Sequence, residues 1–562
     1  MSDSATSDAR RADVAIVGLG AGGAVAAHLL TAAGLDVVAI EAGPRLDAAE
    51  MTLDEIRNDI RGWLAAPKAA GEEPTFLPRG ATESRRPPFP TVMMNSVGGS
   101  MVHFPGLMIR FQPSNFRTRS AAVERYGEDA LPADSTVADW PISYDELEPY
   151  YGLVEQAIGV GGEAGASRFE GHRSTAYPLP ALRRSGWTEL AAEGARSRGW
   201  HPYPSPAALN AEPFNGRPAC TYCGFCSMNG CYLGAKGSPD QNLIPWAEAT
   251  GRLRVLSGAR ATRIETDDAG RASGVRYLDG GVERFQAARV VLLATFVYEN
   301  TRLLLRSAGP DWPDGLSNRA GQVGRHYTAH VTPVVWGAFP GRKLNAWNGA
   351  WGQATCIDDW NSDNFDHDGL GFVSGGMLTV PHELKPIMLA SAPLPPSVPR
   401  WGSAWKRWLA GNGASLGYAV GQFDCLTYEH NVLELDPTVR DSLDEPVIRI
   451  SYELGENERR GHDFLRDRLH EWFDAMGAGE TWHGPGQAIE ARHAYGGTRM
   501  GDDPVSSVVD RNGLSHEVPN LGVLGASTFP TAGGVNPTLT LQAVAWRTAA
   551  HLVENWESVT GG

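Results

Sequence analysis

Residues 13–41 read DVAIVGLGAGGAVAAHLLTAAGLDVVAIE, and this stretch decides the fold. A short apolar strand leads into closely spaced glycines, an alanine-rich helical pattern and a second apolar strand. Strand, glycines, helix and strand in this order predict a βαβ unit that binds a dinucleotide. Within this unit, Gly18 permits the tight turn and Gly20 lets the backbone reach a pyrophosphate. Gly23 lets the helix pack closely on the strand.

The second strand ends in Glu41, roughly 20 residues after the glycines. A carboxylate at this distance accepts hydrogen bonds from the ribose hydroxyls and repels a ribose phosphate, so NADP is disfavoured. The first turn of the helix after Gly20 supplies N–H donors and positive potential for the phosphates. This unit does not by itself separate FAD from NAD, and a glycine-rich turn without a ligand is the plain structural alternative.

The chain has 562 residues and a formal charge of 49 − 65 = −16. Its length predicts two or more domains, or one large fold with an insertion. The excess of acidic residues argues against a nucleic-acid partner, because phosphate binding needs clustered Lys and Arg. No run of about 18 apolar residues occurs, so we expect no membrane span. Arg10 and Arg11 directly precede a strand rather than an apolar targeting segment, so we expect a cytoplasmic protein unless a signal-bearing partner exports it.

Two blocks near the C-terminus carry further motifs. The first begins at His493 and reads HAYGGTRMG, and the second, residues 520–547, reads NLGVLGASTFPTAGGVNPTLTLQAVAWR. In the second block, Pro537 at a first helical position and the apolar spacing after it predict the start of a helix. Backbone N–H groups at such a start can stabilise negative charge on a bound group.

Taken together, these motifs resemble the glucose–methanol–choline (GMC) family of flavoprotein oxidoreductases over nearly the whole chain. Further matches are Val97-Gly98-Gly99-Ser100, Trp140-Pro141 and RVVLLATFVYENTRLLLRSAG at 289–309. The resemblance implies an α/β fold, with a Rossmann-like FAD-binding domain and an α+β substrate domain built on an antiparallel sheet. It implies that the FAD domain is assembled from 1–110, 236–330 and 481–562. The substrate side then comprises 111–235, with a cap and a Cys-rich segment, and 331–480.

The resemblance also implies FAD as the cofactor, and His493 and Asn536 as the catalytic pair. Oxidation of an alcohol needs a base for the O–H proton, and a neutral imidazole suits this role near neutral pH. Asn536 can donate to the substrate oxygen without competing for the proton. A core histidine with satisfied hydrogen bonds is the alternative for His493. Contacts to the cofactor are implied for Gly18, Gly20, Gly23, Glu41, Gly98, Gly99, Ser100, His103, Ala526, Ser527, Pro537 and Thr538.

His103 lies in GGSMVHF, residues 98–104, which resembles the flavin-attachment segment of pyranose oxidases. In those enzymes a histidine at this offset carries a covalent FAD, and a non-covalent contact is the alternative here. Phe296 stands where the family usually has a glycine, a variant that resembles the sugar and polyol dehydrogenase branch. His330 ends a G-R-x-x-x-x-H stretch that we interpret as structural or close to the flavin.

Four of the six cysteines fall within 12 residues, at Cys220, Cys223, Cys226 and Cys231. Thiolates at short spacing can hold an iron–sulfur cluster, but the fourth gap is one residue longer than in ferredoxins and no proline follows. Disulfides that staple a loop, or small apolar side chains in a turn, are the alternatives. In the dehydrogenases that this chain resembles, such a segment is associated with electron transfer to a small subunit or a cytochrome.

The leading hypothesis is an FAD-dependent oxidation of an alcohol group on a sugar, glycoside or polyol. His493 would be the base, flavin N5 would take the hydride, and the electrons would pass to an acceptor other than NAD. One alternative is an oxidase of the pyranose-oxidase type, which would use oxygen and form peroxide. An alternative of another class is a GMC-type lyase that holds FAD without redox use.

Overall fold

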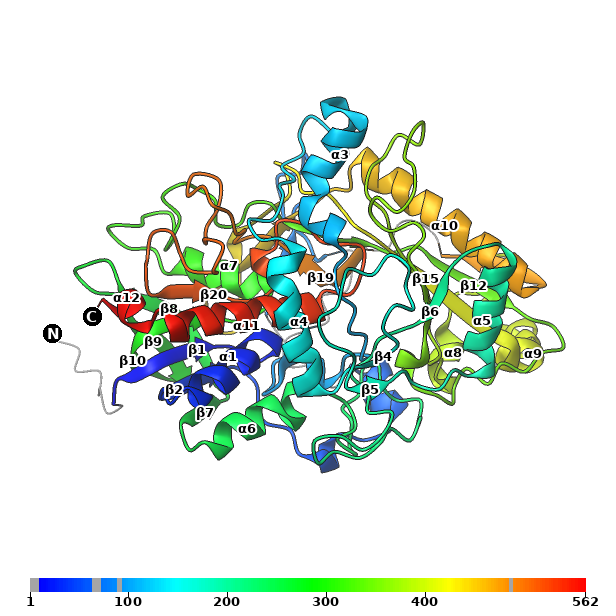
Figure 1. The fold of residues 1–562 in the computed structure, drawn as a ribbon, viewed down its shortest axis with the longest axis horizontal. Helices are drawn as coiled ribbons and strands as arrows, with labels where there is room; N and C mark the ends of the chain where they lie inside the picture. Colours follow the sequence, from blue (N-terminus) through cyan, green and yellow to red (C-terminus); the bar gives the residue numbers. More distant parts are fainter. Residues whose placement is uncertain (1–9, 63–71, 88–92, 485–488, 562) are drawn as a thin grey trace.

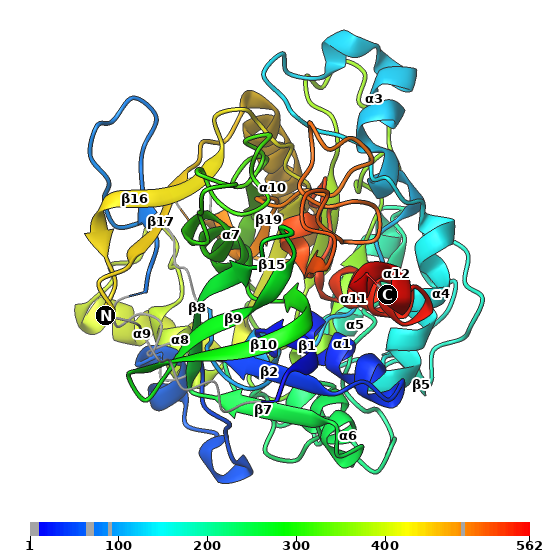
Figure 2. The same ribbon diagram turned by 90° about the vertical axis from the view of Figure 1, so that its left-hand side faces the viewer.

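Two sheets organise the chain in the computed structural model, which describes residues 10–62, 72–87, 93–484 and 489–561 (Figure 1). The first sheet has the strand order β7-β2-β1-β10-β9-β8, with β20 paired to β10 (Figure 2). Its parallel part contains β1 (Ala12–Val17), β2 (Val37–Glu41), β7 (Leu253–Ser257), β10 (Val282–Leu293) and β20 (Leu521–Val523). Antiparallel strands β8 (Ala259–Thr266) and β9 (Ala272–Asp279) extend it along the long β10.

The parallel strands are covered on their faces, which explains their continuous apolar sequences. Every residue of β2 is buried, and so are all but one residue of β1. Helix α1 (Ala21–Ala32) packs against the C-terminal helix α11 (Thr538–Glu554). Gly22 lies at this contact, facing Leu541 and Ala545 of α11.

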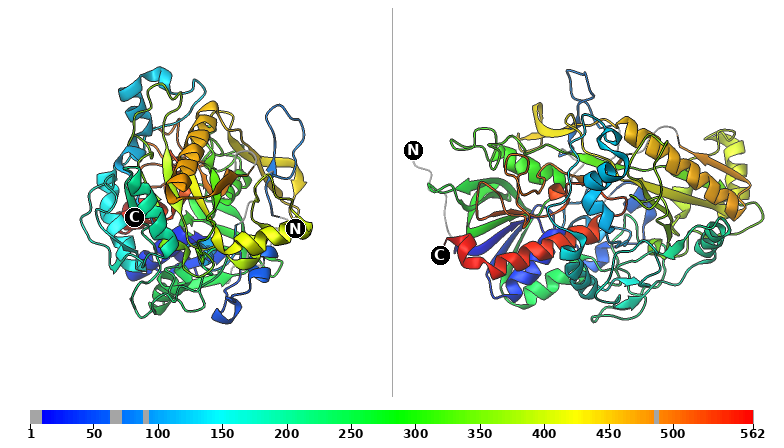
Figure 3. Two further views of the ribbon diagram at one scale, coloured as in Figure 1. Left: turned by 90° about the vertical axis from the view of Figure 1, so that its right-hand side faces the viewer. Right: turned by 45° about the horizontal axis from the view of Figure 1, so that its top comes forward.

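The second sheet is antiparallel, with the order β18-β12-β15-β14-β13-β6, and β11 joins β15 to β19. Its strands are β6 (Pro202–Pro204), β11 (Thr328–Val331), β12 (Val334–Ala338), β13 (Thr355–Ile357), β14 (Gly376–Val380), β15 (Leu416–Phe423), β18 (Glu480–His483) and β19 (Ile489–Tyr495). Helix α10 (Glu456–Met476) packs on β15 and on helix α5 (Gly186–Ser197) through buried Leu465, Leu469 and Phe473. Figure 3 shows α10 and α11 along different parts of the molecule, each beside its own sheet.

The remaining elements surround these two sheets. The other helices are α3 (Thr118–Tyr126), α4 (Tyr144–Ile158), α6 (Leu243–Ala249), α7 (Val297–Arg306), α8 (Pro386–Ser391), α9 (Gly402–Asn412) and α12 (Trp556–Thr560). The other strands are β3 (Thr75–Phe76), β4 (Gly161–Gly162), β5 (Leu179–Pro180), β16 (Val432–Arg440) and β17 (Pro446–Ser451). Among the residues that the structure describes, no helix is both long and apolar enough to cross a membrane.

The predicted fold class is confirmed, because a Rossmann-like parallel unit and an antiparallel sheet are both present. Segments from the beginning, the middle and the end of the chain share the first sheet. Both ends of the chain accordingly lie at that side of the molecule (Figure 1). The individual domain boundaries stay a prediction.

The turn after β1 leads to a testable prediction, because a Cβ on Gly23 would lie 2.1 Å from the carbonyl oxygen of Gly18. Gly23→Ala should therefore force the turn open and lower the free energy of unfolding by about 1–3 kcal/mol, as overpacking does elsewhere. Thermal unfolding measures this effect. Gly186→Ala is the matched control, since Gly186 begins α5 and a Cβ there would meet no neighbouring atom within 4 Å. Equal melting temperatures for the two variants would contradict the prediction.

Candidate active site

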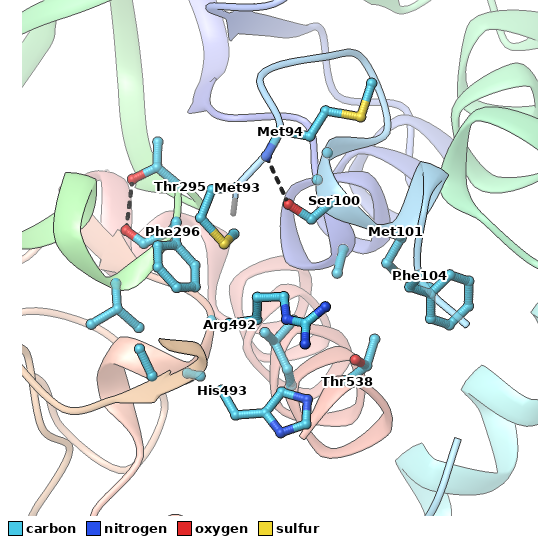
Figure 4. Close-up of a pocket in the computed structure, with 18 of the residues that line it drawn as sticks. Met93, Met94, Ser100, Met101, Phe104, Thr295, Phe296, Arg492, His493 and Thr538 are labelled. Atoms are coloured by element: carbon cyan, nitrogen blue, oxygen red, sulfur yellow. Dashed lines mark hydrogen bonds between the residues drawn. The ribbon is translucent and has the colours of Figure 1, made fainter. Parts of the chain in front are cut away.

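A cavity of about 590 Å³ is lined by residues of both sheets (Figure 4). The first sheet contributes Val17 and Ile40, at the carboxyl ends of β1 and β2. The second sheet contributes three side chains of β15, namely Tyr418, Val420 and Gln422. Ligands of open α/β sheets bind at the carboxyl ends of the strands, so the cavity lies where a dinucleotide is expected.

Glu41 is buried at the nucleotide end of this cavity and holds the glycine turn in place. Its carboxylate accepts hydrogen bonds from the backbone N–H of Leu19 and of Gly43, each at 2.9 Å. A carboxylate has about four lone-pair positions and can accept from more than two donors, so ribose hydroxyls are suitable partners for Glu41. Gly18, with φ +89°, and Gly20 also line the cavity, whereas Gly23 does not and acts in packing.

The segment around Gly99 closes the cavity opposite the glycine turn. A Cβ on Gly99 would lie 2.8 Å from the Cα of Gly20, so two backbones meet there without side chains between them. Gly99 and Ser100 line the cavity, while Gly98 lies behind the wall with a φ of +99°. The Ser100 hydroxyl accepts a hydrogen bond from the Met94 N–H at 3.1 Å (Figure 4).

His103 lines the same cavity and is 5% exposed. Its Nε2 has no hydrogen-bond partner among the described residues. Burial, together with the charges of Lys236 and Arg492, lowers the pKa of His103 to about 3. The imidazole is therefore neutral and presents a buried polar atom that lacks a protein partner, which fits a site that receives a polar group.

His493 and Asn536 meet at the cavity, as the sequence motifs predict. His493 comes from β19, and Figure 4 shows its ring beside Arg492 on the cavity wall. The Asn536 Nδ2 lies 3.4 Å from His493 Nε2. The Gln422 Nε2 donates to Asn536 Oδ1 at 3.1 Å, which turns the Asn536 amide so that its nitrogen faces the imidazole.

His330 supports His493 from β11, the neighbouring strand. The Nε2 of His330 lies 2.6 Å from the carbonyl oxygen of Gly533, and its Nδ1 lies 3.2 Å from Nδ1 of His493. A carbonyl can only accept, so Nε2 of a neutral His330 carries the hydrogen and its Nδ1 is the acceptor. His493 then donates from Nδ1, and its Nε2 keeps the lone pair that a base needs.

Helix α11 begins one residue later than predicted. Pro537 is the N-cap residue, with φ −80°, and Thr538 is the first residue of the helix. Pro537 caps because its carbonyl accepts the first helical hydrogen bond, from Leu541 N–H at 2.9 Å. Pro537, Thr538 and Ala526 line the cavity, but Ser527 lies behind the wall, where its hydroxyl accepts from the Asn300 amide at 3.0 Å.

The four clustered cysteines are free thiols, and they form no metal site in the described part of the chain. No group of three or more His, Cys, Asp or Glu side chains is arranged there to hold a metal ion. Burial raises the pKa of the Cys220 thiol to about 11 and also raises the pKa of the Cys226 thiol. The described residues therefore show neither an arrangement of ligands for an iron–sulfur cluster nor a disulfide among these cysteines.

The contacts that two residues make in the site are not visible in a local motif. Gln422 lies within β15, and only the pairing of that strand brings it to Asn536. His330 belongs to a stretch that resembles the family, but its contact with His493 depends on the pairing of β11 with β19. Alternation along a strand identifies which side chains share a face, but not what they face.

Comparisons with known proteins agree with this geometry. A model of the family described as GMC oxidoreductase matches residues 427–545. The gluconate 2-dehydrogenase flavoprotein of Pantoea cypripedii is 32% identical, over 97% of this chain and 94% of that protein. The 2-methyl-1,2-propanediol dehydrogenase of Mycolicibacterium austroafricanum is 29% identical, over 99% of this chain and 97% of that protein. A solved structure of formate oxidase from Aspergillus oryzae has the same fold, with a TM-score of 0.65. The two sequences are 15% identical, and the match covers 99% of this chain and 100% of the formate oxidase chain.

Asp424 is a buried carboxyl group close to Gly533, in the loop that carries Asn536. Its ionisation predicts how the stability of the protein depends on pH. Burial raises the pKa of Asp424 to about 7, although hydrogen bonds from Ser374 and from the backbone of Gly533 oppose this rise. The folded state therefore retains a proton that the unfolded chain loses near pH 4, so stability falls as the pH rises from about 4 to about 7.

Asp424→Asn removes this ionisation while keeping an acceptor for the Gly533 N–H. The stability of the variant relative to the parent should therefore be greater at pH 8 than at pH 5. The expected change in the difference of their free energies of unfolding is about 1–3 kcal/mol, and melting temperatures at the two pH values measure it. Asp474→Asn, on the exposed face of α10, is the control and should show no such difference. A constant offset for Asp424→Asn between the two pH values would refute the assignment.

Proposed function

The chain belongs to the GMC oxidoreductase family, enzymes that act on CH–OH groups, and on this premise we propose that it oxidises an alcohol group of a sugar, glycoside or polyol. The electrons pass to an acceptor other than NAD. The single observation that carries the proposal is the pair of His493 and Asn536 on the wall of the cavity. The names of the two sequence relatives, which refer to gluconate and to a diol, support this class of substrate.

GMC oxidoreductases bind FAD, and the residues that line the cavity fit this cofactor. Gly18, Gly20 and Glu41 would hold its nucleotide half, where the turn and the carboxylate provide the groups that a dinucleotide needs. The following residues would hold the flavin half: Gly99, Ser100, His103, Ala526, Pro537 and Thr538. Bound FAD supplies the two-electron acceptor that takes a hydride from the alcohol carbon.

The chain's own residues move the proton. The Nε2 of His493 accepts the proton of the substrate hydroxyl, and its Nδ1–H stays hydrogen-bonded to His330. The positive charge that develops on His493 is stabilised through His330 to the carbonyl of Gly533. Asn536 donates from Nδ2 to the substrate oxygen and orients it toward His493, which leaves the Nε2 lone pair of His493 for the substrate proton.

Removal of the base should slow the chemical step without loss of the cofactor. His493→Ala should reduce the rate of flavin reduction by substrate under anaerobic conditions by about 10²–10⁴-fold. Stopped-flow absorbance measures this rate, and the ratio of flavin to protein absorbance reports FAD content. The control is His516→Ala, because His516 lies between the two C-terminal blocks and is hydrogen-bonded to Ser507 outside the cavity; this variant should keep the parent rate. A His493→Ala variant with the parent rate would rule out this base.

The tautomer of His493 should depend on an acceptor at position 330. His330→Gln keeps an acceptor for the Nδ1–H of His493, whereas His330→Leu does not. The leucine variant should lose up to about 10⁴-fold in rate, the loss known for a wrong histidine tautomer, and the glutamine variant should lose much less. The pH profile of flavin reduction should shift for the leucine variant. Equal rates and equal profiles for the two variants would contradict the tautomer argument.

The function itself is tested by anaerobic titration with a panel of sugars, glycosides, polyols and primary alcohols. Bleaching of the flavin by a member of the first three classes supports the proposal, and a flavin that stays oxidised while a substrate is cleaved identifies a lyase instead. With the best substrate, peroxide yield compared with dye reduction separates an oxidase from a dehydrogenase.

Two details of the cofactors are separate proposals with separate assays. We propose that His103 contacts the flavin, and acid precipitation tests whether the contact is covalent, because covalent flavin stays with the precipitate.

Iron and acid-labile sulfide assays on anaerobically purified protein test for a cluster, which the free thiols lead us not to expect. Copurification tests the proposed small subunit or cytochrome acceptor.

A further inference from the structure

Lys236 is a buried lysine whose ammonium group is held by backbone carbonyls. It is 1% exposed. Its Nζ donates to the carbonyl oxygens of Asn229 at 2.8 Å, Phe104 and Cys226 at 2.9 Å and Val102 at 3.2 Å. No carboxylate of the described residues lies within ion-pair distance of Lys236. Burial of an ammonium group costs desolvation free energy, and the hydrogen bonds to these four carbonyls offset this cost.

The four carbonyls come from two segments that are far apart in the sequence. Val102 and Phe104 lie on either side of His103, whereas Cys226 and Asn229 belong to the cysteine segment, residues 220–231. The Met228 N–H of that segment also donates to the carbonyl of His103 at 3.0 Å. The carbonyls of residues 102, 103 and 104 are therefore all bonded to Lys236 or to the cysteine segment, which fixes the backbone that carries the imidazole.

From these contacts we propose that Lys236 is a positioning residue for His103. It clamps the backbone on both sides of the imidazole to the cysteine segment, and it thereby sets where the unpartnered Nε2 of His103 meets the cofactor. The proposal rests on the proposed FAD site. It also gives the cysteine segment a role that needs neither a metal nor a disulfide: Ser227 and Met228 line the cavity, and the segment forms the outer support of its wall.

A second buried lysine provides a matched control. Lys385 is also 1% exposed, and its Nζ donates to Asp59 at 2.9 Å and to the carbonyl of Ser227 at 2.6 Å. Both lysines hold the cysteine segment, but the polar contacts of Lys385 go to these groups and to Glu383 rather than to residues 102–104. A role in stability alone would give the two lysines similar effects on the flavin.

The test compares Lys236→Met, Lys385→Met, His103→Ala and the double variant Lys236→Met/His103→Ala as holoenzymes. The readouts are the visible absorption spectrum of the bound flavin, its midpoint potential and the melting temperature. We expect Lys236→Met to change the spectrum and the potential in the same direction as His103→Ala. In the His103→Ala background, the lysine substitution should add no further change, because coupled residues give non-additive effects.

Lys385→Met should lower the melting temperature and leave the flavin spectrum unchanged. The proposal is overturned if Lys236→Met leaves the flavin unchanged, or if its effect is the same with and without His103. Lys236→Gln keeps two N–H donors for the carbonyls, so it serves as the second variant if Lys236→Met does not fold. Lys236→Gln should change the flavin spectrum in the same direction as His103→Ala. These readouts require no substrate, so a failure of the proposed alcohol oxidation in the titration panel is distinguishable from a failure of the clamp.

Discussion

The close contact of backbones without side chains around the β1–α1 turn is the constraint on which the site depends. A Cβ at Gly23 would overlap the Gly18 carbonyl, and one at Gly99 would press on Gly20. The segment around Gly99 can therefore meet the turn at residues 18–23 only because glycine stands at each contact. Glu41 then fixes the turn through the backbone N–H of Leu19, and the N–H of Gly43, just after β2, holds the carboxylate in position. Asn536, one of the two proposed catalytic residues, is placed relative to this point, because α11, which follows it, packs on α1.

The sequence allowed the prediction of those parts of the site that depend on local geometry. Gly18, Gly20 and Glu41 were predictable because strand, turn and helix follow one another within 29 residues, and His493 and Asn536 because each lies in a compact motif. Gln422 and Lys236 were not, because each acts through a partner more than 100 residues away or through carbonyls, which leave no residue-specific signal. The cysteine spacing suggested metal ligands, but the burial of the thiols and their arrangement in space depend on the packing of the whole segment.

The two buried lysines show two ways to compensate an ammonium group. Lys385 has carboxylates as partners, Asp59 and Glu383, while the hydrogen bonds of Lys236 to described residues all go to carbonyl dipoles. Carbonyls remain hydrogen-bond acceptors at every pH, so the contacts of Lys236 do not depend on the ionisation of a partner. A structural support made of main chain is also insensitive to the identity of the residues that provide it. The part of the cysteine segment that holds Lys236 is therefore its main chain, and these contacts involve none of its thiols.

The row of groups from Gly533 through His330 to His493 ends on a main-chain oxygen rather than on a side chain. That oxygen belongs to Gly533, where φ is +61° and a Cβ would lie 2.7 Å from the Phe111 ring, so packing fixes the backbone that provides the acceptor. The orientation of the proposed base is thus set by main chain, whereas other parts of the cavity wall are side chains, such as Val420 of β15 and Met388 of α8. Under the proposed function, substrate range can diverge through these two wall positions while the base keeps its orientation, so one scaffold can acquire new alcohols without rebuilding its chemistry.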